Sequence, residues 1–386
     1  MYKPSLLDSF FLGGFECSTQ RRRDGRRLDL IASTQHDQMA AADYRSLAQH
    51  GIRSVRDGVR WHRIETAAGQ YDWSSFLPML RAARHSQTQV IWDLCHYGWP
   101  DDIDIWYPEF VERFARFSAA VARVMRDEGI TAPLFCPVNE ISYWAWAGGT
   151  TARFNPSARG RGDELKFQLV RATIAAIDSI REVLPHARFV QVDPVIHIVS
   201  RGSRRRDRDN VEGARLAQYH AWDLVTGRDY PGLGGKPEYL DIVGVNYYSD
   251  NQWYANGETI TRNDPNYRPF KDILTETHQR YGRPLLVAET GAEGDKRAPW
   301  LRYVSEQVGE ALRRNVPVEG ICLYPVTDYP GWTNYRHCKT GLLSYPNDQG
   351  VRPLHPPLAK EIADQQARFS ALFTSHPRAR TADASP

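Results

Sequence analysis

Short apolar runs alternate with amphipathic segments along most of the chain. The runs are six to eight residues long and rich in β-branched and aromatic residues, which is typical of strands buried in a parallel sheet. They lie at residues 11–16, 51–56, 89–96, 134–140, 187–193, 241–248, 284–291 and 318–324. The segments between them have the periodicity of helices that bury one face.

The clearest helix lies between the third and fourth strands, where Phe110, Phe114, Phe117 and Val121 recur at intervals of three or four residues. Other helices are predicted over residues 37–49, 73–84, 163–183, 211–225, 270–281, 300–314 and 357–373. Ser74 or Ser75 is the expected cap of the helix over 73–84.

The alternation of strands and helices predicts an α/β protein with a parallel sheet, and eight such units predict a closed (β/α)8 TIM barrel. An open, doubly wound sheet is the alternative. We expect one catalytic barrel domain over residues 1–373, because no linker or internal repeat divides it. The polar residues 374–386 are predicted to form a disordered tail.

The fourth and seventh predicted strands each carry a glutamate at the C-terminal end. The fourth has Asn139-Glu140 there, and the seventh has Glu289. Either glutamate alone is a weak signal, since a glutamate after an apolar run is often a helix N-terminal residue or a solvated loop residue. In a barrel, however, the C-terminal ends of the strands share one mouth, so the two form a candidate acid and nucleophile pair for glycoside hydrolysis.

Other polar and aromatic residues fall at the same mouth. They are Glu16, Gln20, Arg56, His96, Asn139, Tyr248, Tyr324 and Trp332. Asn139, His96 and Gln20 are candidates for binding sugar hydroxyls, and a tryptophan suits the apolar face of a sugar ring.

Two of these residues have a simpler alternative. Arg56, together with Tyr248, is expected to hold Glu289 in its ionised form, but it could instead neutralise a buried carboxylate such as Asp57 or Asp93. His96 could be a core histidine with both nitrogens satisfied. Trp144 and Trp146, which follow Glu140, are expected to surround that carboxyl and keep it protonated.

The amino-acid composition narrows the range of possible partners and substrates. With 41% hydrophobic residues, 25% charged residues and a net charge of +3, the 386-residue chain gives no reason to expect nucleic acid or an anionic membrane as a partner. Eleven tryptophans, 19 tyrosines and 14 phenylalanines suit a small carbohydrate substrate, although they suit an ordinary core equally well. No H-E-x-x-H motif or pair of histidines at one strand end is present, so no metal and no cofactor are predicted.

The cysteines and the N-terminus bear on the compartment. The cysteines are odd in number and contain no C-x-x-C pair, which predicts buried free thiols: Cys17, Cys95, Cys136, Cys322 and Cys338. No basic region followed by a long apolar run begins the chain, and no later segment is long enough to cross a bilayer, so a cytoplasmic location is expected. The oligomeric state is left open.

The motifs around these residues resemble those of the glycoside hydrolases of clan A, and most closely family 1, the β-glucosidase-like enzymes. Arg56, Trp61, Arg63 and Ile64 match the segment Y-R-F-S-I-S-W-S-R-I of that family. The other matching stretches are 95–100 with H-W-D-L-P, 138–140 with N-E-P, 246–248 with N-Y-Y and 288–291 with T-E-N-G. The resemblance implies a retaining β-glycosidase with Glu140 as general acid/base and Glu289 as nucleophile. A transglycosylase using the same site, or an inert carbohydrate-binding barrel, is the alternative.

The departures from the family bear on the substrate. Gly331 replaces the glutamate of the D-N-F-E-W motif, which usually grips the O4 and O6 hydroxyls, while Ile141 and Tyr97 replace a proline and a tryptophan. An unfamiliar glycone is therefore expected. The arginine-rich segments 21–23 and 201–208 are either solvated loops or a source of positive potential that favours an acidic substrate.

Overall fold

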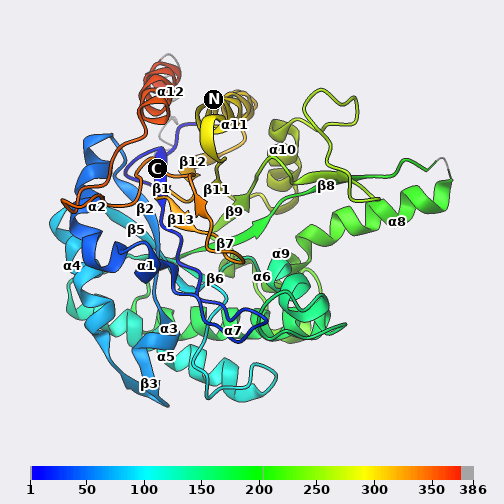
Figure 1. The fold of residues 1–386 in the computed structure, drawn as a ribbon. Helices are drawn as coiled ribbons and strands as arrows, with labels where there is room; N and C mark the ends of the chain where they lie inside the picture. Colours follow the sequence, from blue (N-terminus) through cyan, green and yellow to red (C-terminus); the bar gives the residue numbers. More distant parts are fainter. Residues whose placement is uncertain (1, 203, 375–386) are drawn as a thin grey trace, which may run out of the picture.

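The computed structural model describes residues 2–202 and 204–374, and within them eight parallel strands close into a barrel (Figure 1). In chain order the strands are β1 (Phe11–Gly14), β2 (Ser54–Gly58), β5 (Gln89–Cys95), β6 (Leu134–Val138), β7 (Arg188–Pro194), β9 (Ile242–Asn246), β11 (Leu285–Thr290) and β12 (Val318–Leu323). The first strand pairs with both the second and the last, so the sheet has no free edge. The predicted (β/α)8 barrel is confirmed, and the open sheet is excluded.

All eight predicted strands are present, but most are shorter at their C-terminal ends. The fourth strand ends at Val138 and the sixth at Asn246, whereas the apolar pattern carried them to residues 140 and 248. The difference arises because the last residues of each run leave the ladder and enter the barrel mouth. Those residues include Glu140, so the candidate active site is expected at the C-terminal ends of the strands.

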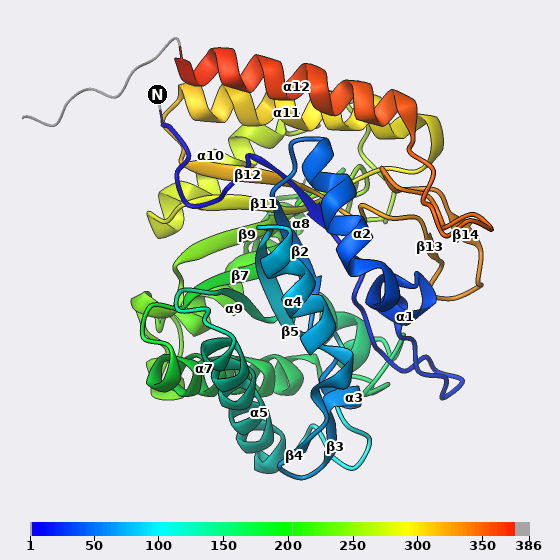
Figure 2. The ribbon, with the colours of Figure 1, turned by 90° about the vertical axis from the view of Figure 1, so that its left-hand side faces the viewer.

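Helices surround the barrel. The longer ones are α2 (His36–Gln49), α4 (Leu77–His85), α5 (Pro108–Asp127), α7 (Gly162–Val183), α8 (Arg205–Leu216), α10 (Phe270–Tyr281), α11 (Arg297–Arg313) and α12 (Pro356–Thr374). Figure 2 shows α11 and α12 side by side along one flank of the barrel, and the two helices are in contact. The apolar face predicted for α5 is buried at Phe110, Phe114 and Phe117.

Two predicted helices are divided in the structure. Residues 73–84 form a 3-10 turn at Trp73–Ser75, capped by Asp72 and not by a serine, before α4 begins beside Pro78. Residues 211–225 are split into α8, a 3-10 turn and α9 (His220–Val225), and α8 begins earlier than predicted. The first turns of α8 are charged and carry no regular apolar stripe, so the hydrophobic periodicity could not indicate where this helix begins.

The C-terminal tail predicted over residues 374–386 lies outside the described residues except for Thr374, which is the last residue of α12. All five cysteines are buried and free, as predicted. Among the described helices, none combines the length and the apolar content that a bilayer crossing requires.

The bottom of the barrel is closed by the N-terminal segment. The buried carboxylate of Glu319 on β12 accepts hydrogen bonds from the hydroxyl of Tyr2 and from the backbone N–H groups of Ser5 and Leu6, the last two at 2.9 Å. Inside the barrel, side chains such as Leu12, Ile91 and Leu286 form a separate apolar core. The N-terminal segment and this apolar core thus fill the lower end of the barrel interior.

A buried charge network joins α2 to the barrel. His36 lies between the carboxylates of Asp43 and Asp57, at 2.8 Å from each, and Arg352 donates to Asp43 at 2.7 Å. Burial lowers the pKa of His36, but the negative charges of Asp57 and Asp43 outweigh burial and raise the pKa to about 9. His36 is therefore a cation at neutral pH and pairs with both aspartates.

This network predicts a loss of stability in mild alkali. A histidine whose pKa is higher in the folded state contributes stability that is complete below its unfolded value of 6.5 and disappears as the pH rises through about 9. The full contribution is roughly 3 kcal/mol. Urea unfolding between pH 6 and 10 measures it, and His36→Gln should remove this part of the slope. An unchanged slope in the variant would contradict the assignment.

Candidate active site

The C-terminal ends of the barrel strands surround one cavity of about 1060 Å³. Its wall includes both candidate catalytic glutamates and several aromatic rings: Glu16, His96, Tyr97, Glu140, Tyr248, Glu289, Tyr324 and Trp332. Glu140 and Glu289 are 9% and 5% exposed, so both carboxyl groups face the cavity with little access to bulk water. The volume is sufficient for a glycoside of two or more rings.

Glu289 is held by a cation and a phenol. Arg56 Nη1 lies 2.6 Å from Glu289 Oε1, and the hydroxyl of Tyr248 donates to Oε2 at 3.0 Å. The pairing of β11 with β9 shifts register between Val287 and Glu289, which re-aims this side chain at the strand end. The structure thus brings Arg56 and Tyr248 into contact with Glu289, and both contacts would favour the ionised form of its carboxyl group.

Glu140 has a different environment. The hydroxyl of Tyr97 donates to its Oε2, and Asn246 Nδ2 donates to its Oε1 at 2.9 Å. Burial, and then the negative charge of Glu289, raise the pKa of Glu140 to about 8. Glu140 thus keeps its proton at neutral pH.

The backbone at Glu140 is unusual. Glu140 has φ 47° and ψ 61°, and its partner Tyr97 also has a positive φ of 67°. Non-glycine residues adopt this left-handed region at an energetic cost, and such positions are concentrated at functional sites. The conformation turns the chain out of β6 and directs the carboxyl group into the cavity.

The neighbours expected for Glu140 were wrong. Trp144 is buried and donates its indole N–H to the carbonyl oxygen of Asn155 at 2.9 Å, away from the cavity wall. Trp146 is 42% exposed and lines the outer part of the cavity. The proton on Glu140 is favoured by burial and by the charge of Glu289, and the two tryptophans are not its partners.

Beneath the cavity floor, Arg56 links several strands. It donates to both carboxylate oxygens of Asp93, at 2.8 and 2.6 Å, and to Asn139 Oδ1 at 2.6 Å. Arg56 therefore does both things that the sequence suggested: it neutralises Asp93 and also holds Glu289. A single guanidinium fixes the ends of β2, β5, β6 and β11 relative to one another.

Asn139 and His96 belong to the same network. Asn139 Nδ2 lies 3.0 Å from both His96 Nε2 and the hydroxyl of Tyr97, and His96 Nδ1 lies 3.0 Å from Asp93. The side-chain groups of Asn139 are therefore satisfied below the cavity wall, where they position Tyr97. His96 lines the cavity with its ring, but both nitrogens are engaged by the protein.

Cys17, Asp93 and His96 lie close enough to share a metal ion. Both oxygens of Asp93, however, already accept hydrogen bonds from Arg56, whose charge opposes a cation at this point. We therefore assign no metal role to this cluster.

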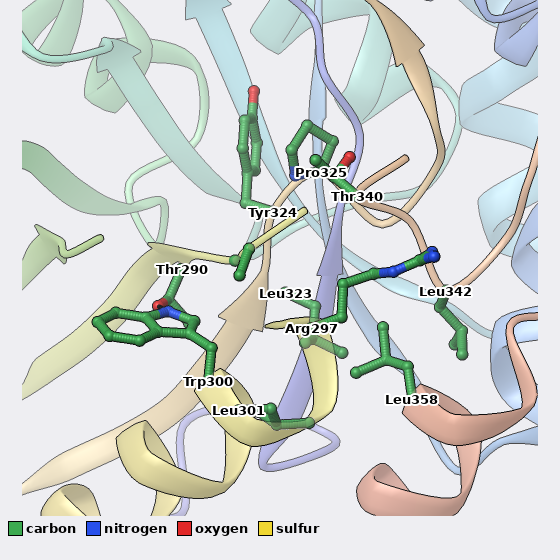
Figure 3. Close-up of a pocket in the computed structure, with 12 residues that line it drawn as sticks. Thr290, Arg297, Trp300, Leu301, Leu323, Tyr324, Pro325, Thr340, Leu342 and Leu358 are labelled. Atoms are coloured by element: carbon green, nitrogen blue, oxygen red, sulfur yellow. Dashed lines mark hydrogen bonds between the residues drawn. The ribbon is translucent and has the colours of Figure 1, made fainter. Parts of the chain in front are cut away.

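The outer face of β11 is anchored separately. The indole of Trp300 donates to Thr290 Oγ1 at 2.9 Å, and that hydroxyl donates to the carbonyl oxygen of Tyr247 at 2.7 Å. Figure 3 shows Thr290 and Trp300 beside a hollow between β11, β12 and helices α11 and α12. The hollow measures about 10 Å³, room for one water molecule at most, so it is not a substrate site.

Two glycines permit the close approach of strand ends at this point. A Cβ atom on Gly291 would lie 2.3 Å from the carbonyl oxygen of Tyr324, and one on Gly14 would lie 2.2 Å from the Tyr324 ring. Only glycine fits at either position without displacing Tyr324. The Tyr324 ring is thereby held at the cavity wall, with its hydroxyl making no hydrogen bond to any described residue.

The remaining predicted ligands differ in position. Tyr248, Tyr324 and Trp332 line the cavity. Gln20 is 1% exposed and is not part of the cavity wall, and its Oε1 atom has no partner among the described residues. Its role in binding sugar hydroxyls therefore stays a prediction.

Sequence reasoning missed several residues in the wall and directly behind it. Asn246 is buried behind the wall at the end of β9, where the same strand-end rule would have selected it as a partner of Glu140. Tyr143, Arg153 and Lys166 come from the segment between β6 and the first turns of α7 and form the wall on the Glu140 side. No local motif marks those three side chains.

The arginine-rich segments do not line the cavity. Arg21 pairs with Asp101 and Arg22 with Asp24, while Arg201 pairs with Glu258 at 2.9 Å. Ion pairs of this kind are typical of solvated loops. At Arg21, Arg22 and Arg201 the positive charge is offset by an acidic partner.

Fold and site together define a (β/α)8 barrel with two buried carboxyl groups in unequal environments at its mouth. No protein-family model matches the sequence, and a comparison with curated protein sequences finds no significant match.

Solved structures match nearly the whole chain. A family 1 β-glucosidase from Thermotoga maritima superposes with a TM-score of 0.76 at 15% identity, over 92% of this chain and 98% of the enzyme. A β-glucosidase from the same organism in complex with glucoimidazole gives 0.77 at 15%, over 93% and 98%. The AHE enzyme from Alicyclobacillus herbarius gives 0.77 at 16% identity, over 95% and 99%. The resemblance to family 1 β-glucosidases is thus confirmed for the fold.

Proposed function

We propose that this protein is a retaining β-glycosidase, a divergent relative of the family 1 β-glucosidases. The observation that carries the proposal is the unequal environment of two buried glutamates at one barrel mouth. Arg56 and Tyr248 hold Glu289, whereas burial and the charge of Glu289 keep the proton on Glu140. Double displacement needs such a pair, with one anion ready to attack and one acid ready to donate.

In the first step, a Glu289 oxygen attacks the anomeric carbon while Glu140 gives its proton to the departing glycosidic oxygen. Cleavage of that bond leaves a glycosyl ester on Glu289. The ester removes the negative charge that raised the pKa of Glu140, so the Glu140 carboxylate then accepts a proton from the attacking water. Arg56 and Tyr248 become free to stabilise the carboxylate as it departs in the second step.

The site also supports an assignment of the two ends of the cavity. Because Glu140 protonates the leaving oxygen, the leaving group lies on its side, beside Tyr143 and Trp146. The glycone then lies over Glu289, near Tyr324 and Trp332. The β-glucosidase complexes with glucoimidazole, castanospermine and deoxynojirimycin support a small carbohydrate ligand for a barrel of this shape.

The stereochemistry of the first-formed product tests the mechanism. We expect proton NMR of an aryl β-glycoside digest to show the β-anomer of the free sugar first, with the α-anomer appearing only through mutarotation. An α-anomer formed first would mean that water attacks directly, as it does when carboxyl groups are about 6.5 to 9.5 Å apart. Such a result would exclude Glu289 as a nucleophile.

A further inference from the structure

A third carboxylate faces the cavity and takes no part in the two chemical steps. Glu16 follows β1 and is 4% exposed. Its Oε1 atom accepts a hydrogen bond from the backbone N–H of Ser18 at 3.0 Å, and the nearby Ser18 hydroxyl also lowers the pKa of this carboxyl group. No arginine or lysine among them lies within 4 Å of this carboxylate. A buried carboxyl group in this position lacks the partner that would offset its loss of solvation.

The electrostatic neighbours of Glu16 place it beside the reacting groups. Burial raises the pKa of Glu16, His96 acts in the opposite direction, and the charge of Glu289 raises the pKa further. The charge of Glu16 in turn raises the pKa of Tyr324 and Tyr329, where it is the largest influence after burial. Glu16 thus lies among His96, Glu289 and the two tyrosines, on the glycone side of the cavity.

The loop after β12 cannot supply a carboxylate to this region. Position 331 is glycine, and a Cβ atom built there would lie 2.8 Å from Asn334 Oδ1 and 3.4 Å from Cys338 Sγ. A side chain at 331 would therefore run into the loop itself. Tyr329 and Trp332, on either side of it, do line the cavity. The loop after β12 thus contributes aromatic rings and no carboxylate to the cavity wall, and Glu293, which lines the cavity from the segment after β11, is paired with Arg336.

We propose that Glu16 is a specificity-determining residue that accepts hydrogen bonds from hydroxyl groups of the glycone. The inference rests on the proposed glycosidase function and names the substrate class of that site: a neutral, hydroxyl-bearing glycone. The free oxygen of Glu16 needs a donor, and a ring hydroxyl supplies one without adding charge beside Glu289. An acidic glycone would bring a third negative charge next to Glu16 and Glu289, which is unfavourable in a buried site.

The distribution of cations agrees with this preference. The arginine-rich segments, from which an acidic glycone was suggested, are paired outside the cavity. The two cations of the cavity wall, Arg153 and Lys166, come from the segment between β6 and α7 and so lie on the leaving-group side. No cation of the described residues is available to a carboxylate on the glycone.

The test compares Glu16→Gln with the wild type on aryl β-glycosides that share one leaving group: the β-glucoside, its monodeoxy derivatives and the β-glucuronide. We expect kcat/KM for the β-glucoside to be about 10- to 100-fold lower in the variant, as for loss of a hydrogen bond to a charged group. For the deoxy derivative that lacks the hydroxyl bound by Glu16, kcat/KM of the variant should be less than about threefold below that of the wild type. The ratio of kcat/KM for the β-glucoside to that for the β-glucuronide should also be smaller in the variant. Asp250→Asn, a change at an exposed carboxylate of the same cavity, is the matched control and should leave these ratios unchanged.

A binding measurement separates this inference from the proposed function. Calorimetry with deoxynojirimycin should show weaker binding to Glu16→Gln than to the wild type, and thermal unfolding of both proteins checks that the variant is folded. If the wild type cleaves the glycosides but the variant loses kcat/KM equally on every deoxy derivative, the role of Glu16 is overturned and the glycosidase assignment stays intact. If the wild type cleaves no glycoside but the variant binds deoxynojirimycin more weakly than the wild type, the glycosidase assignment is overturned and the role of Glu16 is kept. Binding equal in both proteins, or absent from both, overturns the role of Glu16.

Discussion

Replacing Glu289 by glycine is expected to abolish turnover of aryl β-glycosides, with kcat falling on the order of 10⁴-fold or more. The variant retains the acid Glu140 but has no group to form the glycosyl ester, so even substrates with very good leaving groups should not be cleaved. Steady-state rates of release of a coloured phenol measure the loss. Glu293→Gly provides a matched control, because Glu293 lines the same cavity but pairs with Arg336 at its rim.

The Glu289 variant also decides between an enzyme and a sugar-binding barrel. Arg56 remains paired with Asp93 when Glu289 is removed, so the barrel should stay folded and its unfolding temperature can be compared with that of the wild type. A folded variant that keeps most of the wild-type activity would show that another group attacks the sugar. A wild type that binds glycosides but cleaves none of them would favour the inert barrel.

The fold was accessible from the sequence because its periodicity is strong. Apolar runs and a helix face such as Phe110, Phe114 and Phe117 report burial directly, and eight repeats leave few topologies other than the barrel. The failures occurred where burial does not follow the pattern. Helix α8 is charged along most of its length, and the turn at Asp72 interrupts the helix predicted at residue 73.

The two glutamates at the barrel mouth were also accessible, since parallel strands in a barrel bring their C-terminal ends to one mouth. That rule identified Glu140, Glu289 and the contact of Arg56 with Glu289. It could not separate residues that touch the cavity from residues one layer below. Asn139 stands at a strand end, yet its amide is used to position Tyr97, because the left-handed backbone at Glu140 turns the next side chain into the cavity instead.

The residues of the cavity wall beside Glu140 required the structure itself. Lys166 is 9% exposed near the start of α7, and its Nζ atom lies 3.4 Å from His220 Nδ1, a contact between segments far apart in the sequence. Arg153 is placed over the ring of Trp146 at 4.2 Å by the path of the loop after β6. Tertiary contacts of this kind leave no local period or motif, so no reading of spacing alone could have found them.

Replacing Glu140 by alanine should produce a selective defect. The acid is needed most when the departing oxygen is strongly basic, so the first step should slow on the order of 10²- to 10⁴-fold with poor leaving groups, while the first step with activated phenols proceeds nearly as fast as before. With activated substrates the glycosyl ester then accumulates, because no base assists water. Azide needs no such base and fits the space left by the carboxyl group, so it should restore turnover and yield a β-glycosyl azide.

The pH dependence of the Glu140 variant provides an independent check. The proton required in the first step is lost as the pH rises through the pKa of Glu140, which burial and the charge of Glu289 raise to about 8, so kcat/KM of the wild type should fall above that pH. In Glu140→Ala this alkaline limb should vanish for activated substrates, whose leaving groups need no proton. Three results together would contradict this assignment: the alkaline limb persists at the same pH, all leaving groups lose rate equally, and azide has no effect. The general acid would then be another residue. The hydroxyl of Tyr97 would then be the first candidate, because it donates to Glu140 and lines the same cavity.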